Sequence, residues 1–189
     1  MKNNFFNDNG YLVIPNLLSD VEDIKQLPPV DEDGNKLTGS LVFDRKSNYW
    51  TSDQVENSFS RINFPDHKFL HHKVKLYLED ILDMYLLKTY TCDRFYYEGN
   101  NLELHTDKNA CEISVTIQIS SDSNKPWPIW FKVSDYEETK VSLYDGDSII
   151  YNGIEIPHWR DKLIDCSYHH QLFLHYVNSQ GNFVSEGKF

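Results

Sequence analysis

A histidine and an aspartate separated by one residue end the strand-like stretch LELHTD, residues 102–107. Because alternate side chains of a strand point to the same face, His105 and Asp107 are expected to lie side by side. A neutral imidazole and a carboxylate are both good ligands for a divalent transition metal. A stable site would need a third protein ligand, which must come from another strand.

The best candidate for the third ligand is His158. It follows LYDGDSIIYNGIEIP, residues 143–157, in which two glycine turns flank an apolar strand, and it opens a new strand. Two histidines and one carboxylate leave half of an octahedral coordination sphere open, which suits non-haem Fe(II) better than a closed tetrahedral zinc site. The other histidines fall at the start of a predicted helix, where we expect them at the surface, or in the last long strand: His67, His71 and His72, and His169, His170 and His175.

The segments that must position these ligands have the character of strands. They are short, rich in β-branched and aromatic residues, and separated by Gly, Asn, Asp and Pro; they occupy residues 89–99, 101–107, 111–120, 126–134, 140–153, 155–163 and 169–178. No internal repeat or linker divides the chain. We therefore predict a single domain over residues 1–189, mainly β with flanking helices, in the form of a double-sheet jelly roll.

The N-terminal half is less regular. Apolar residues recur at three- and four-residue spacings in residues 64–87, which predicts a helix with Asp66 as its N-cap. Residues 10–19 predict a short strand and then a helix that starts near Ser19 and Asp20. Residues 31–60 are polar and turn-rich, so they form either a long surface loop or a pair of irregular strands. Tyr49 and Trp50 lie within them and are candidates for a mobile lid.

Composition excludes several classes of function. The formal net charge is −11, which argues against binding to nucleic acid or to an anionic membrane, because phosphate contacts need clustered cations. The three cysteines are widely spaced and form no CxxC pair, so neither a zinc knuckle nor a disulfide framework is indicated. The first twenty residues lack the apolar core of a signal peptide. We expect a cytoplasmic protein.

The full pattern resembles a known family. H-x-D, an interval of about fifty residues and a histidine at the head of a late strand are similar to the Fe(II)- and 2-oxoglutarate-dependent oxygenases, and more narrowly to their prolyl-4-hydroxylase-like branch. RFYYEGNNLELHTD, residues 94–107, resembles the Arg-Tyr-Gly-x-Gly lead-in of that branch and places Tyr96 at its tyrosine. YNGIEIPHWR, residues 151–160, resembles the strand pair that carries the second histidine. The resemblance implies a double-stranded β-helix, Fe(II) on His105, Asp107 and His158, 2-oxoglutarate and O2.

One part of the family pattern is missing. The family binds the distal carboxylate of 2-oxoglutarate with a lysine or arginine about ten residues after the second histidine, where this chain has Tyr168, His169 and His170. Two candidates remain. Arg160 shares its strand face with His158, and His170 would serve only when it is protonated. We favour Arg160, with the Tyr96 hydroxyl as a second donor.

These observations lead to an oxygenase that hydroxylates an unactivated C–H bond of a small molecule or of a peptidyl residue, for which the branch suggests proline. Two alternatives stay open: a non-catalytic, cupin-like jelly-roll module that binds a metal or another ligand, and a zinc- or manganese-dependent isomerase on the same fold. The substrate and the oligomeric state are not determined by the sequence.

Overall fold

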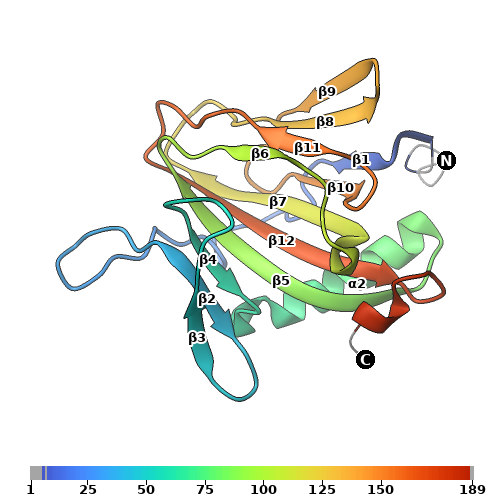
Figure 1. The fold of residues 1–189 in the computed structure, drawn as a ribbon, viewed down its shortest axis with the longest axis horizontal. Helices are drawn as coiled ribbons and strands as arrows, with labels where there is room; N and C mark the ends of the chain where they lie inside the picture. The colour runs from blue at the N-terminus through green and yellow to red at the C-terminus, as the bar shows by residue number, and fades with distance from the viewer. Residues whose placement is uncertain (1–5, 7, 188–189) are drawn as a thin grey trace.

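Two β-sheets face each other and a helix covers the outer side of the larger sheet (Figure 1). The computed structural model describes residue 6 and residues 8–187. The beginning of the N-terminal stretch that we searched for a signal peptide lies outside the described residues.

The larger sheet has the strand order β1-β10-β7-β12-β5-β4-β2-β3. In that order the strands span Tyr11–Ile14, Ser148–Asn152, Ile113–Ser121, Tyr168–Asn178, Leu86–Tyr97, Phe59–Ile62, Gly39–Phe43 and Asn48–Thr51. The smaller sheet has the order β6-β11-β8-β9, with strands at Leu102–His105, His158–Arg160, Ile129–Ser134 and Glu137–Val141. Neighbouring strands are antiparallel except β2 and β4, which are parallel. The prediction of a mainly β, jelly-roll fold is confirmed.

The strands at the centre of the larger sheet are apolar on one face and mixed on the other, because successive side chains alternate. On β12, Leu172, Leu174 and Tyr176 belong to the main core under helix α2, whereas Phe173 and His175 line a cavity between the two sheets. The sheet therefore separates an apolar core from a polar interior in which chemistry can take place.

Helix α2 spans Lys68–Leu82 and follows a 3-10 turn, η1, at Pro65–His67. The prediction of Asp66 as the N-cap is wrong, since the cap position is occupied by His67 without a side-chain hydrogen bond. The helix ends at Asp83, which adopts the left-handed conformation with φ 53°. Its core face includes Val74, Leu78, Ile81 and Leu82. Phe69 in the first turn is exposed, and so is Tyr85, which lies beyond the end of the helix.

The structure corrects two further expectations. The helix predicted near Ser19 and Asp20 is absent, and turns occupy that segment instead. His67 and His71 are buried rather than at the surface; only His72 of that group is exposed. The irregular strands that residues 31–60 allowed are present as β2, β3 and β4.

Two other features concern the chain as a whole. The three cysteines are free and buried. In the described part of the chain, no helix combines the length and the apolar character that crossing a membrane would require. The remaining short elements are η2 at Asn109–Cys111 and η3 at Val184–Glu186.

Candidate metal centre and its cavity

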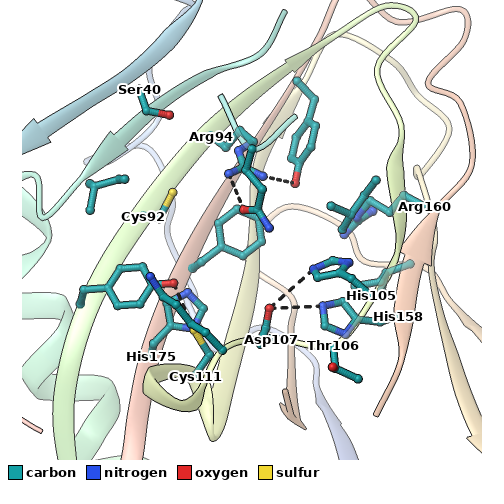
Figure 2. A pocket seen from close by; sticks show the side chains of 18 of the residues that line it. Ser40, Cys92, Arg94, His105, Thr106, Asp107, Cys111, His158, Arg160 and His175 are labelled. Carbon is teal, nitrogen blue, oxygen red and sulfur yellow. Dashed lines mark hydrogen bonds and ion pairs between the residues drawn. The ribbon is translucent and has the colours of Figure 1, made fainter. Parts of the chain in front are cut away.

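The structure brings His105, Asp107 and His158 together at one end of the smaller sheet (Figure 2). His105 ends β6 and His158 begins β11, and the two residues are direct partners in the antiparallel ladder. Their ring centroids are 4.4 Å apart. Asp107 lies just beyond β6, where its backbone N–H donates to the carbonyl of Gly153 at 2.8 Å. Strand pairing and one turn contact therefore set the positions of all three side chains.

The two imidazole rings are held with one nitrogen free for a ligand. Nδ1 of His105 bonds the carbonyl of Glu103 at 2.8 Å, and Nδ1 of His158 bonds the carbonyl of Ile156 at 2.9 Å. A carbonyl only accepts, so each Nδ1 carries the proton and each Nε2 presents its lone pair. Histidines that bind metals in proteins are commonly oriented in this way.

The three atoms that could bind a metal point toward a common position but form no hydrogen bonds with one another. Asp107 Oδ1 is 3.6 Å from Nε2 of His105 and 3.8 Å from Nε2 of His158. Both distances exceed the length of an ordinary hydrogen bond. The three ligand atoms lie within 4.8 Å of one another, which leaves space for a cation between them. The donor set and its spacing fit a divalent metal with two imidazole ligands and one carboxylate ligand.

The second oxygen of Asp107 is anchored by its neighbours. The Ser114 hydroxyl donates to Asp107 Oδ2 at 2.9 Å, and Nδ1 of His175 is 3.0 Å from the same hydroxyl. Because that hydroxyl has a single hydrogen, His175 is the donor when Ser114 donates to Asp107. A Cβ at Gly153 would collide with Asp107 Oδ2 and with Ser114 Oγ. Only glycine at 153 therefore allows the turn to pack against the carboxylate.

Electrostatics favour the ligand forms of two of these groups. Burial raises the pKa of the Asp107 carboxyl, but the bonds and charges of its neighbours, His105 first among them, outweigh burial and leave the pKa below its ordinary value. Burial also lowers the pKa of His158, so this imidazole is neutral near pH 7. The neighbouring Asp107 carboxylate raises the pKa of His105, and a cation bound at Nε2 would compete with a proton there.

A cavity of about 350 Å³ opens beside the three residues. It is near the lower end of the ~300–1,000 Å³ range of small-molecule sites. The strands of both sheets and the segment between β3 and β4 supply its walls. Its ionisable lining residues comprise the three candidate ligands together with Arg94, Arg160, Lys108, His175, Tyr90, Tyr96, Tyr151, Cys92 and Cys111.

Arg160 faces this cavity from β11, two residues beyond His158, as strand alternation predicts. Its side chain is buried, and its guanidinium lies 4.8 Å from the centroid of the Trp127 ring. Nη1 donates to the Trp127 carbonyl, whereas Nη2 is buried and has no hydrogen-bond partner among the described residues. Burial lowers the pKa of Arg160 to about 10, which keeps the group charged at pH 7.

Tyr96 and His170 differ in where they point. Tyr96 is fully buried on β5 and lines the cavity, with its ring edge against Trp127. The structure does not bring His170 to the cavity. That ring stacks on Phe95 at 3.9 Å and bonds Asp93, on the other face of the sheet. Burial, the largest influence, lowers the pKa of His170 despite this bond.

Sequence reasoning missed two buried residues near the site. Arg94 lines the cavity from β5, and His169 lies against Trp127 with both ring nitrogens buried and without partners among the described residues. Alternation along β5 would have placed Arg94 on the face of Tyr96. Lys108, directly after Asp107, lines the cavity, whereas the two lid candidates, Tyr49 and Trp50, are exposed on edge strand β3.

Comparison with known proteins agrees with the topology. The sequence matches no family model and no curated protein. Solved structures do resemble the protein over nearly its whole length. A Pseudomonas putida prolyl-4-hydroxylase is 12% identical with a TM-score of 0.60, and the match covers 93% of this chain and 98% of the other. The fold is that of the Fe(II)- and 2-oxoglutarate-dependent oxygenases.

Two further structures with the oxygenase fold are similar. An oxidoreductase of the 2OG-Fe(II) oxygenase family from Burkholderia pseudomallei is 10% identical with a TM-score of 0.65, covering 94% of this chain and 90% of the other. HygX from Streptomyces hygroscopicus, with nickel, 2-oxoglutarate and hygromycin B bound, is 11% identical with a TM-score of 0.62, covering 94% and 86%. At these identities, the likeness establishes the oxygenase fold.

Proposed function

We propose that residues 1–189 form one oxygenase domain that binds Fe(II) through His105, Asp107 and His158. The observation that carries this proposal is the convergence of three free donor atoms, His105 Nε2, His158 Nε2 and Asp107 Oδ1, beside a cavity. Zinc sites more often close around four ligands, or keep three ligands and one water. The open side of this triad instead leaves space for a chelating cosubstrate.

We propose that 2-oxoglutarate is the cosubstrate and that Arg160 holds its distal carboxylate. A carboxylate removed from water needs a cationic partner, and a guanidinium offers two parallel N–H donors. Arg160 has a buried Nη2 without a partner, which supports this role, and Tyr96 lines the same cavity. His170 is less suitable, because Asp93 already binds its ring and burial keeps it neutral.

With Fe(II), 2-oxoglutarate and O2 bound, the site would convert a substrate C–H group to C–OH with release of succinate and CO2. The protein's own part is to orient the reactants and to limit access of water. The rings of His105 and His158 are fixed by backbone carbonyls, and Asp107 is fixed by Ser114. The small cavity favours a small molecule, or a single side chain of a peptide, as substrate.

Anaerobic titration of the protein with Fe(II) and 2-oxoglutarate tests the proposal. We expect a metal-to-ligand charge-transfer absorption that needs both additions, and slow succinate release once O2 is admitted. His158→Ala should abolish both signals, whereas His72→Ala, which alters an exposed histidine of helix α2, should leave both unchanged. Tight iron binding without the absorption and without succinate would refute the cosubstrate assignment and favour a non-catalytic module.

A further inference from the structure

Arg94 is a second buried guanidinium in the cavity. It lies on β5 and is 6% exposed. Its three hydrogen bonds go to uncharged acceptors: Nε donates to Ser60 Oγ at 2.8 Å, Nη2 to Gln54 Oε1 at 3.0 Å and Nη1 to the Tyr96 hydroxyl at 3.4 Å. A guanidinium has five N–H donors, so this arrangement leaves hydrogen-bonding capacity unused.

No carboxylate neutralises Arg94 within the part of the chain that the structure describes. The adjacent Asp93 points to the opposite face of β5, where it bonds Arg61 and two histidines. Asp53 is near enough to feel the charge of Arg94, but it forms no ion pair with it. A buried cation without a buried anion is costly, so protein interiors normally pair such groups.

The cavity as a whole also has more cationic than anionic lining residues. Arg94, Arg160 and Lys108 line it, and Asp107 is its one acidic lining residue among those described. A divalent metal would more than offset Asp107, and the two carboxylates of 2-oxoglutarate would be taken up by the metal and by Arg160. Arg94 would then still face the cavity as an uncompensated cation, in a protein whose net charge is −11.

The two arginines approach the cavity from different sheets, Arg94 from the larger and Arg160 from the smaller, with the Asp107, His105 and His158 group below them in the view of Figure 2. The wall next to Arg94 includes Gln54, together with Thr51 and Ser52. These three residues are exposed, so the Arg94 side of the cavity borders the solvent. Arg160 is instead covered by Trp127.

We propose that Arg94, held in place by Ser60 and with Gln54 beside it, binds a carboxylate of the primary substrate, and that the enzyme therefore acts on a small organic acid. This inference rests on the proposed function, in which Arg160 is assigned to 2-oxoglutarate. The planar guanidinium matches a carboxylate through two parallel bonds. Binding the acid at the solvent side would hold the rest of the molecule toward the metal ligands, so that Arg94 selects the substrate and orients it.

The direct test compares carboxylates with neutral amides of the same shape. Protein loaded with Mn(II) and with N-oxalylglycine, a non-reactive analogue of 2-oxoglutarate, is titrated anaerobically with acetate and acetamide, and with L-proline and L-prolinamide. Binding is followed by ligand-observed NMR and by the thermal midpoint. We expect each acid to bind at least about 10-fold more tightly than its amide, which is the range of one charged hydrogen-bonded contact.

Matched variants assign that preference to one arginine. Arg94→Gln should remove the preference for acids while the affinity for N-oxalylglycine stays within about threefold of the wild type. Arg160→Gln should weaken the binding of N-oxalylglycine and leave the preference for acids in place. The inference is overturned if Arg94→Gln no longer binds N-oxalylglycine, or if this variant still binds acids more tightly than amides.

Gln54→Glu gives a second readout in case Arg94→Gln fails to fold. The new carboxylate takes the position of Oε1, 3.0 Å from Nη2 of Arg94, and supplies the missing anion from within the chain. We expect a higher thermal midpoint and about 10-fold weaker binding of acetate. An unchanged acetate affinity would contradict the proposal.

Failure of the proposed function would be visible separately. It would appear as wild-type protein that binds neither Mn(II) nor the analogue. Acetate and acetamide titrations of unloaded wild-type and Arg94→Gln protein would then still measure the preference of Arg94 for acids.

Discussion

Two groups in this protein combine one aspartate with two histidines, and they are built differently. Around Asp107 the imidazole nitrogens stand 3.6 and 3.8 Å from the carboxylate, beside a cavity. Around Asp93 the corresponding distances are 2.9 Å to His67 and 3.4 Å to His170, and Arg61 adds a further bond to each carboxylate oxygen. The first group is open and its donors are unsatisfied, whereas the second is closed.

The difference shows that residue types alone do not make a metal site. In the Asp93 group the charge of Arg61 occupies the position that a cation would need, and Asp93 is fully buried. In the Asp107 group the backbone and Ser114 bind the atoms that face away from the cavity, so the remaining donors have no partner except one another. The closed group is suited to stability and the open one to binding.

The largest expected effect is on stability at the closed group. Asp93→Asn would leave Arg61 and two histidines around a neutral side chain, and breaking a buried ion pair in this way typically costs about 3–5 kcal/mol. Urea unfolding of the metal-free protein measures this loss. Asp107→Asn is the matched control and should cost clearly less, because that carboxylate is partly exposed. Equal losses in the free energy of unfolding would mean that the two groups contribute equally to stability.

The second effect is on binding at the open group. Asp107→Asn should lower succinate production and Mn(II) affinity by more than about 100-fold, since losing a ligand exceeds the ~10–100-fold cost of losing a residue that supports one. Isothermal titration with Mn(II) and a succinate assay measure both quantities. The corresponding change on β12, His170→Gln, should leave Mn(II) affinity unchanged. A comparable loss in His170→Gln would contradict the assignment of the metal ligands.

A smaller effect is expected where Ser114 supports Asp107. Ser114→Ala removes the hydrogen bond to Oδ2 at 2.9 Å and should weaken Mn(II) binding by about 10-fold. Ser114→Thr keeps the hydroxyl and should recover part of that loss. Mn(II) titrations of the two variants, with thermal midpoints to check folding, make the comparison. Equal affinities in both variants would exclude a positioning role.

The smallest effect is a pH dependence of stability at the closed group. Burial lowers the pKa of His170. Below a pH of about 6.5, the histidine of the unfolded chain is therefore protonated while the folded one stays neutral. The free energy of unfolding should therefore fall as the pH falls below about 6.5, by at most ~1.4 kcal/mol per pH unit for this group. His170→Gln should flatten that slope in urea titrations between pH 7.5 and 5.5. A slope identical to that of the wild type would show that His170 titrates alike in both states.

Asp93 should also lower the free energy of unfolding as the pH falls, but in a lower pH range. Burial raises the pKa of its carboxyl, but the bonds from His170, His67 and Arg61 outweigh burial and hold the pKa far below its ordinary value. The stability that it contributes is complete above the unfolded pKa of about 3.9 and is lost as the pH falls through the folded value.

Local patterns predicted the open group well. Alternation along a strand placed His105 beside Asp107, and the turns before Pro157 indicated a strand that begins at His158. The jelly-roll fold followed from the length and spacing of the β segments. Each strand and turn was recognised from near neighbours in the sequence, whereas the grouping of His158 with His105 and Asp107 also rested on the resemblance to the oxygenase family.

Residues whose surroundings come from distant segments were missed. His67 was expected at the surface, but it bonds Asp93, 26 positions away. In the sequence, Arg94 is like any other arginine of a strand. Its partners come from distant segments: Ser60 from β4, 34 positions away, and Gln54 from the loop before β4, 40 positions away. The Asp66 cap failed because a 3-10 turn precedes helix α2.

The contact between Asp107 and Gly153 has a consequence for the apo protein. The loop after β6 and the turn before β11 share a backbone hydrogen bond and a close approach that only glycine permits. This contact joins the segments that carry the three candidate ligands, so we expect one segment to move only when the other moves with it. Loading with metal should then require almost no rearrangement, so uptake would be fast and limited by dehydration of the ion rather than by movement of the chain.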